Sequence, residues 1–249
     1  MTSIWKTEAG NRFARRYKEW EISSQSLDQK KAKFISAIHA GGSLLDVGVG
    51  TGSVAALLAR TGCLLTVLDV NGAMLDEASK IIDSDSTAYV CKDFLEYETN
   101  EKFDTIYAVN NVLFEFLSVE DQKNFFRKCS RLLSKNGKLI IETYLISDRM
   151  MMGIQPIFFE EKNNAVYFTK QQIDCTLQTI RYTDYLLDTP NSTFEKFEYI
   201  TRYSSPPEID LMASLSGLVL SQRYSDWEKA PYTHLKDSVI STYEHRVQI

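Results

Sequence analysis

From residue 43 to residue 145, short apolar runs alternate with amphipathic segments along the chain. The apolar runs are typical of buried strands, and the segments between them carry apolar residues at the three- and four-residue spacing of helices. Strands joined by helices in this way form right-handed βαβ units and a parallel sheet. The pattern predicts strands at 44–47, 64–68, 88–91, 103–109 and 138–145, helices at 53–60, 73–82 and 119–133, and a turn at Asn136 and Gly137.

The two flanks of this region follow other patterns. Before it, we expect helices at 11–20 and 27–40, which form an N-terminal helical cap over residues 1–42. After it, β-rich segments at 171–187 and 192–203 predict an antiparallel hairpin. A helix that opens with Pro206 and Pro207 and runs through Leu215, followed by Gly217, precedes two last strands at 218–227 and 238–245. The prediction is an α/β domain over 43–249, with a mostly parallel seven-stranded sheet, helices on both faces, and an antiparallel β insertion at about 155–205 between the fifth and sixth strands.

Composition narrows the class of protein. The chain has 249 residues, which is enough for one large domain or one domain with an insertion. Its net charge is −5, so the basic excess of a duplex-binding protein is missing and we expect no nucleic-acid partner. The sequence has no run of 18 apolar residues and no apolar N-terminal run, so we expect no membrane partner and a cytoplasmic protein. The four cysteines are isolated and predict neither a zinc site nor a disulfide framework.

A glycine-rich turn follows the first predicted strand, with Gly48, Gly50 and Gly52 at alternate positions. Glycine permits a tight turn, and the free N–H groups of the following helix suit an anionic ligand. Dinucleotide-binding turns read G-x-G-x-x-G or A, but the place of the third small residue is taken by Val54 here. The spacing therefore departs from the dinucleotide pattern.

Four segments together resemble the class I S-adenosylmethionine-dependent methyltransferases, in the branch that acts on small molecules. They are the glycine turn, Asp69 at the end of the second strand, the fourth-strand segment 103–111, and the segment 132–139, which departs from the family pattern at Lys135 and Asn136. The resemblance covers residues 11–145 and implies a Rossmann-like fold with S-adenosyl-L-methionine as the cofactor. It also implies that no metal is needed.

The resemblance assigns parts of the cofactor to particular residues. Asp46, Gly48, Gly50 and Gly52 are expected to shape the methionine end of the site. Asp69 is expected to hold the ribose hydroxyls, and Asn110 to end the fourth strand beside the methyl donor. The adenine is expected to lie among Val70, Met74, Asp93 and Phe94.

Candidates for catalysis follow from the strand ends, because ligands of open α/β sheets lie at that edge. Glu115 can orient an amine or accept a proton, or can be a helix-surface carboxylate. Tyr144 ends the fifth strand near Glu142, which can equally be a structural carboxylate. Tyr17 matches an N-terminal tyrosine that often closes over the donor in this family, although an amphipathic surface helix explains it as well.

The insertion is rich in aromatic residues, which can form a lid, an acceptor pocket or the face of a homodimer: Tyr182, Tyr185, Phe197, Tyr199 and Tyr203. The (N/D)PP(Y/F) motif of many amino-group methyltransferases is absent after the fourth strand, where the chain reads Asn110-Asn111-Val112-Leu113. We therefore expect methyl transfer to a nitrogen or oxygen of a small-molecule acceptor. Two alternatives stay open at this point: an NAD(P)-dependent oxidoreductase, and a partner subunit that binds S-adenosylmethionine without catalysis.

Overall fold

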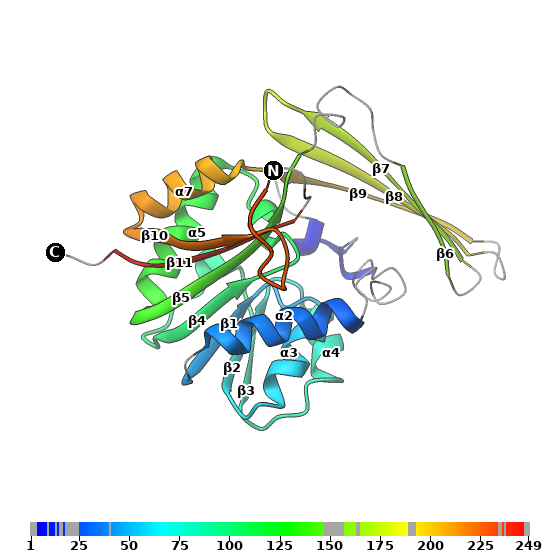
Figure 1. The fold of residues 1–249 in the computed structure, drawn as a ribbon. Coiled ribbons are helices and arrows are strands. Elements are labelled where there is room, and N and C mark those ends of the chain that lie inside the picture. The colour runs from blue at the N-terminus through cyan, green and yellow to red at the C-terminus, as the bar shows by residue number, and fades with distance from the viewer. Residues whose placement is uncertain are drawn as a thin grey trace.

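The computed structural model describes residues 4–8, 10–12, 14, 17, 25–39, 41–146, 157–162, 165–188, 193–233, 236 and 238–246. Within these residues the strands form two sheets (Figure 1). The larger sheet has seven strands in the order β10-β11-β5-β4-β1-β2-β3. Its strands are β1 (Ser43–Val47), β2 (Leu64–Asp69), β3 (Thr87–Cys91), β4 (Phe103–Ala108), β5 (Leu133–Tyr144), β10 (Leu218–Tyr224) and β11 (Ser238–His245).

The directions of these strands confirm the predicted mostly parallel sheet. β1 pairs in parallel with β2 and β4, and the outer pairs β2–β3 and β4–β5 are also parallel. β11 alone runs antiparallel to its neighbours β10 and β5. Because the strands β1 to β5 are parallel to one another, their carboxyl ends lie at the same edge of the sheet. Ligands of such sheets bind at that edge.

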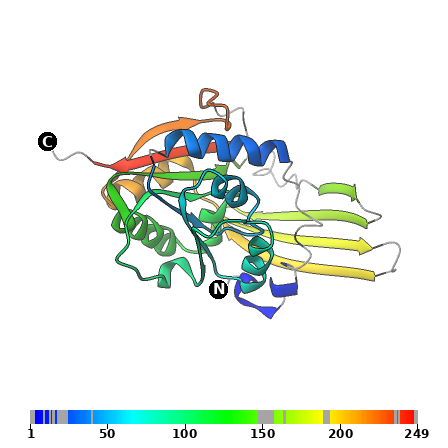
Figure 2. The same cartoon turned by 90° about the horizontal axis from the view of Figure 1, so that it is seen from below.

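Helices cover both faces of the large sheet (Figure 2). On one face lie α2 (Gln25–Ile38), α3 (Ser53–Ala59) and α4 (Gly72–Ser79), whose apolar residues share a core with the sheet. On the other face lie α5 (Val119–Leu132) and α7 (Pro206–Leu215). The described residues also include the short 3-10 helices η1 (Ile4–Lys6), η2 (Phe94–Glu96) and η3 (Val112–Glu115).

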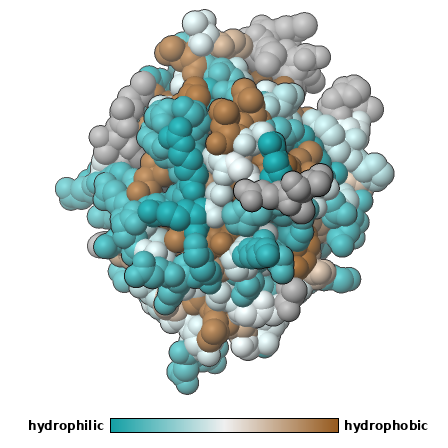
Figure 3. Space-filling view, turned by 90° about the vertical axis from the view of Figure 1, so that its left-hand side faces the viewer, coloured by the Kyte–Doolittle hydropathy of each residue, from teal (hydrophilic) through white to brown (hydrophobic). Residues whose placement is uncertain are grey.

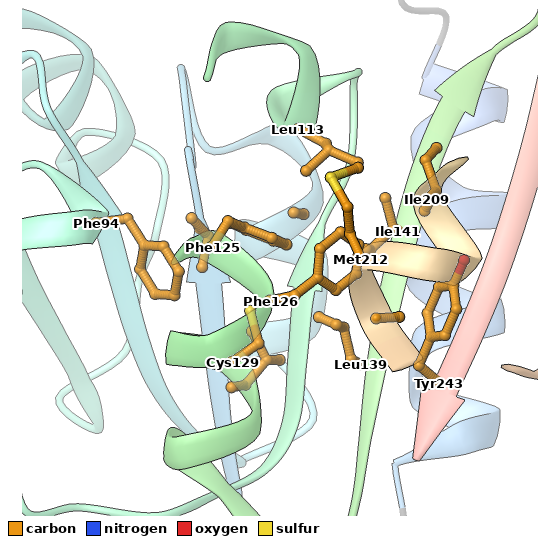
Figure 4. Close-up of a cluster of buried hydrophobic side chains, with 14 of the residues drawn as sticks. Phe94, Leu113, Phe125, Phe126, Cys129, Leu139, Ile141, Ile209, Met212 and Tyr243 are labelled. Atoms are coloured by element: carbon orange, nitrogen blue, oxygen red, sulfur yellow. The ribbon is translucent and has the colours of Figure 1, made fainter. Parts of the chain in front are cut away.

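The core on the α5 and α7 face is built from large apolar side chains (Figure 4). Phe125 and Phe126 of α5 are fully buried, and their rings meet edge to face with centroids 5.4 Å apart. Met212 of α7 and Tyr243 of β11 complete the contact between the helices and the sheet. This packing joins segments from both sides of the insertion into one hydrophobic core.

The insertion is larger than the predicted hairpin. It is a four-stranded antiparallel sheet of β6 (Ile157–Lys162), β7 (Ala165–Asp174), β8 (Thr179–Asp188) and β9 (Thr193–Arg202). The prediction of one continuous β segment over 171–187 is wrong, because the chain turns between β7 and β8. Asp174 accepts hydrogen bonds from the N–H groups of Thr176 and Leu177 there, and Gln178 takes a left-handed conformation with φ 53°.

Two further predicted elements need comment: the turn at Asn136 and Gly137, and the helix at 11–20. The turn predicted at Asn136 and Gly137 is wrong, because β5 runs from Leu133 through both residues. The pairing of β5 with β4 shifts register between Phe103 and Thr105, so the glycine lies at an irregularity inside a strand. Of the helix predicted at 11–20, residues 11, 12, 14 and 17 are helical, and the others lie outside the described residues.

The surface shown in Figure 3 is mostly hydrophilic, with hydrophobic residues in separate patches. None of the helices in the described ranges is both long enough and apolar enough to cross a membrane.

Candidate functional site

A cavity of about 560 Å³ lies at the carboxyl edge of the large sheet. Its walls come from the β1–α3 turn, the ends of β2 and β3, the loop after β4, the N-terminal segment and the insertion. Eleven of the thirteen residues predicted from the sequence line it: Tyr17, Gly48, Gly50, Asp69, Val70, Met74, Asp93, Phe94, Asn110, Glu115 and Tyr144. The fold therefore brings together segments that are far apart in sequence.

Gly48 and Gly50 give the turn after β1 its shape. Both have positive φ, 76° and 55°, a conformation that other residues adopt at a cost. A Cβ on Gly48 would lie 2.6 Å from Cγ2 of Val112, so the turn packs against the loop after β4. A Cβ on Gly50 would meet nothing within 4 Å, so the cavity comes directly up to the backbone at this position.

Asp46 and Gly52 flank or belong to the turn, but neither of them lines the cavity. Gly52 begins α3 with φ 82°, and a Cβ there would lie 2.8 Å from Cβ of Ala78 in α4. Asp46 is 2% exposed within β1, and burial raises its pKa to about 8, with the charge of Asp69 adding to the shift. Of the residues predicted for the methionine end of the site, the structure therefore places Gly48 and Gly50 in the cavity wall and these two outside it.

Asp69 links the end of β2 to the glycine turn. Its Oδ2 accepts a hydrogen bond from the N–H of Gly50 at 2.9 Å, and its Oδ1 accepts one from the N–H of Asn71 at 2.9 Å. Burial raises the pKa of Asp69, and these N–H donors oppose the shift by stabilising the carboxylate. A carboxylate has about four lone-pair sites, so the hydrogen bonds to the backbone leave room for ligand hydroxyls.

Asp93 lines the cavity shortly after the end of β3. Its Oδ1 accepts a hydrogen bond from the N–H of Leu95 at 2.7 Å, and its Oδ2 is paired with the ammonium of Lys6. Phe94 beside it is 3% exposed, and its ring centroid lies 5.3 Å from that of Phe125. The N-terminal segment thus contacts the part of the site in which the adenine is expected.

The loop after β4 places Glu115 at the cavity wall. Asn110 and Asn111 both have positive φ, 56° and 64°, and the second begins the 3-10 helix that ends at Glu115. The Glu115 carboxylate accepts a hydrogen bond from the indole N–H of Trp5 at 3.0 Å. Burial raises the pKa of Glu115 to about 7, and the hydrogen bond from Trp5 limits the shift.

Aromatic side chains surround Glu115. The hydroxyls of Tyr144 and Tyr182 lie 2.6 Å apart, and the ring of Tyr182 stacks on Tyr199 with centroids 4.7 Å apart and planes at 7°. Trp5 lies 6.5 Å from the ring of Tyr199 and 6.3 Å from that of Tyr17. We call Trp5, Tyr17, Tyr144, Tyr182 and Tyr199, together with Glu115, the aromatic chamber. Burial raises the pKa of both Tyr144 and Tyr182, so their hydroxyls stay protonated near neutral pH.

Two residues of the cavity wall, and one residue that contacts the wall at Asn110, could not be singled out from the sequence. Trp5 and Lys6 precede the region with a recognisable pattern, and Lys31 occupies a position of α2 where a lysine is normally solvent-exposed. Their contacts join segments 66 to 111 residues apart, so no local spacing indicates them.

The sheet order, the glycine turn and the cavity at the strand ends agree with the resemblance to class I S-adenosylmethionine-dependent methyltransferases. Residues 44–137 match the family model described as a methyltransferase domain, which confirms the resemblance predicted from the sequence. The cofactor that this resemblance implies is S-adenosylmethionine. A search of curated proteins gave no match.

Solved structures show the same fold over nearly the whole chain. The CcbJ methyltransferase from Streptomyces caelestis is 24% identical, with a TM-score of 0.85 and 97% of this chain and 99% of that chain covered. CalS10 from Micromonospora echinaspora, an amino pentose methyltransferase solved with S-adenosylmethionine bound, is 15% identical, with a TM-score of 0.68 and 97% of each chain covered. The sugar N-methyltransferase KedS8 from Streptoalloteichus is 13% identical, with a TM-score of 0.69 and 92% of each chain covered.

The residues of the cavity fit this cofactor. The open space at Gly50 lets a ligand approach the backbone, and the Asp69 carboxylate beside it suits ribose hydroxyls. Among the described residues, no cluster of three or more His, Cys, Asp or Glu side chains is suited to a metal ion.

Proposed function

We propose that the protein transfers the methyl group of S-adenosylmethionine to the nitrogen of a small amine. The observation that carries this proposal is the position of Glu115 in the aromatic chamber, beside the end of the cavity formed by the glycine turn. A carboxylate among aromatic rings favours a cationic or amine ligand through charge attraction and cation–π contact. The CalS10 and KedS8 methyltransferases, which act on an amino pentose and on a sugar nitrogen, support an amino compound as the acceptor.

The size of the cavity favours a small acceptor. Its volume of about 560 Å³ lies within the range of about 300–1,000 Å³ that is usual for small-molecule sites. The residues expected around the cofactor and those of the aromatic chamber line this same cavity. An acceptor bound in the chamber is therefore shielded from water by Trp5 and the insertion.

The chemistry of the chamber favours nitrogen over oxygen. The sulfonium of S-adenosylmethionine supplies an electrophilic methyl group. An uncharged amine attacks the methyl carbon with its lone pair, and the carbon–sulfur bond breaks with its electron pair left on the sulfur of S-adenosylhomocysteine. The Glu115 carboxylate, whose pKa is about 7, can accept the proton that the nitrogen loses. An alcohol would need a stronger base, and the protonated hydroxyls of Tyr144 and Tyr182 do not provide one. A phenolate or carboxylate acceptor would be repelled by ionised Glu115.

We assign the remaining groups to binding. Tyr144, Tyr182 and Tyr199 form the wall against which the acceptor packs, and Tyr17 and Trp5 close the chamber from the N-terminal side. Asp69 holds the ribose, Asp93 the adenine amino group, and Gly48 and Gly50 the methionine end. Asn110 lies where the cofactor part of the cavity meets the acceptor part.

The test is a methyl-transfer assay on separate panels of amines, amino sugars, alcohols, phenols and carboxylates, with product masses measured. Methylated amines or amino sugars, together with a loss of about 100-fold or more in kcat/KM in Glu115→Gln, would support the proposal. Glu120→Gln is the matched control, because Glu120 lies on the exposed surface of α5 and pairs with Lys123 and Arg127. Products only from oxygen acceptors would refute it. Binding of S-adenosylhomocysteine without any product would favour the non-catalytic partner subunit.

A further inference from the structure

A buried ion pair lies beneath the cavity, between the helix α2 and the strand β5. The ammonium of Lys31 lies 2.8 Å from Oε2 of Glu142, and the side chains are only 2% and 11% exposed. Neither residue lines the cavity. Removing two charges from water is unfavourable unless they are paired and hydrogen-bonded, so a buried pair at this position calls for an explanation.

Both side chains of the pair converge on Asn110. The N–H of Asn110 donates to Oε2 of Glu142 at 2.7 Å, and Lys31 donates to the side-chain oxygen of Asn110. The other carboxylate oxygen of Glu142 accepts a hydrogen bond from the indole N–H of Trp227 at 2.9 Å. Lys31 also lies 5.7 Å from the centre of the Trp227 ring. The network thus connects α2, β5 and the segment after β10 to a single residue at the end of β4.

Asn110 needs such support because of its backbone. It and Asn111 both lie in the left-handed region, with φ 56° and 64°, which is disfavoured for residues other than glycine. Asparagine tolerates the region better than most residues, but two in succession persist only when the surroundings hold them.

The loop that starts at Asn110 contacts the cofactor turn and also contributes to the aromatic chamber. Asn110 itself lines the cavity, and Val112 fills the space beside Gly48 of the cofactor turn. Four residues after Asn111, the same loop presents Glu115 to the aromatic chamber. A displacement at Asn110 therefore moves groups that face the cofactor and the acceptor together.

We propose that Lys31 and Glu142 are positioning residues, which hold the left-handed turn at Asn110 and through it the loop over residues 110–115. Their effect on the cofactor side does not depend on the identity of the acceptor. Their effect on Glu115 rests on the function proposed above.

The test compares Lys31→Met, which keeps the approximate length of the side chain without its charge, with Lys31→Arg, which keeps the positive charge and hydrogen-bond donors. Calorimetry with S-adenosylhomocysteine measures the cofactor side, and kcat and KM measure the reaction. We expect Lys31→Met to weaken S-adenosylhomocysteine binding about tenfold or more and to raise KM for S-adenosylmethionine. Lys31→Arg should recover most of the affinity.

Lys30→Met is the matched control. Lys30 is the neighbour of Lys31 in α2 and pairs with Glu228 at 2.7 Å, but these side chains are 44% and 67% exposed. Removal of this surface pair should leave binding and catalysis unchanged. An equal loss of S-adenosylhomocysteine affinity in Lys30→Met and Lys31→Met would overturn the proposal. The loss would then follow from removing any positive charge from α2.

Folding is measured in parallel by circular dichroism and thermal melting. A folded Lys31→Met variant that binds S-adenosylhomocysteine within about twofold of the unchanged protein would overturn the proposal. If that variant does not fold, the double variant Lys31→Met with Glu142→Gln, which leaves no unpaired charge, decides by the same criterion. If neither folds, the pair serves the fold and not the loop, and the proposal is overturned. Weakened S-adenosylhomocysteine binding would support it even if the acceptor proves not to be an amine.

Discussion

Gly50 and Gly52 stand two residues apart in the same turn, but replacement by alanine should affect different properties of the protein. Both have positive φ, 55° and 82°. The difference lies in what an added methyl group meets. At Gly50 it meets nothing within 4 Å and stands in the cavity, whereas at Gly52 it lies 2.8 Å from Cβ and 3.0 Å from Cα of Ala78.

The left-handed conformation alone disfavours alanine by about 1 kcal/mol at each position. For a chain of this size this corresponds to a decrease of about 3 °C in melting temperature. Gly52→Ala must in addition displace the backbone of α4, and overpacking of this kind costs about 1–3 kcal/mol. We therefore expect Gly52→Ala to lower the free energy of unfolding by about 3 kcal/mol and the melting temperature by roughly 6–12 °C.

Binding should show the opposite order. The methyl group of Gly50→Ala occupies space that we assign to the methionine end of the cofactor, so affinity for S-adenosylhomocysteine should fall about tenfold or more, or about 1.4 kcal/mol. Gly52→Ala should bind within about threefold of the unchanged protein at temperatures where it is folded. Differential scanning calorimetry measures the first property, and isothermal titration calorimetry measures the second.

Two results would refute this reasoning. If Gly50→Ala bound S-adenosylhomocysteine as tightly as the unchanged protein, the cofactor would not approach the backbone at Gly50. If Gly50→Ala and Gly52→Ala lowered the melting temperature by the same amount, the contact between Gly52 and α4 would not add to the loss of stability.

Three further predictions concern titratable groups and their partners. The acceptor's kcat/KM should rise with pH through about 7 as Glu115 ionises, and Glu115→Gln should abolish this limb of the pH–rate profile. Trp5→Phe removes the N–H that stabilises the Glu115 carboxylate, so the same limb should move to higher pH; an unmoved limb would contradict the contact between these two side chains. Asp46 keeps its proton to about pH 8 when folded but loses it near pH 4 when unfolded, so the free energy of unfolding should fall as pH rises between these values. Thermal melts of Asp46→Asn between pH 5 and 8 should show a smaller fall, and parallel curves for the two proteins would contradict the assignment.

The large sheet was predictable because its signals are local. The strands β1, β2 and β4 are short apolar runs, and the helices that follow them (α3, α4 and α5) have their own periodicity and boundary residues. The glycine turn could be recognised for the same reason, since positive φ at Gly48, Gly50 and Gly52 requires residues without a side chain at fixed spacing.

The errors fall where the deciding interactions are weakly encoded or distant. The turn between β7 and β8 contains neither glycine nor proline, and it depends on hydrogen bonds to the Asp174 side chain and on a left-handed Gln178. At Gly137 the strand continues across the register shift, because β5 pairs with β4 at Leu133 and again from Lys138, with Gly137 between these two pairings.

By itself the sequence determined the α/β architecture and the glycine turn, and it indicated eleven of the residues that line the cavity, because strand ends, turns and helix starts are set by neighbouring residues. Only the tertiary structure decided the aromatic chamber, the contact of Trp5 with Glu115, and the burial of Lys31 against Glu142 and Asn110. These contacts join residues 79 to 111 positions apart. The physical reason is that charge, burial and hydrogen-bond partners at such sites are properties of packing, which places distant side chains in one low-dielectric space and has no periodicity along the chain.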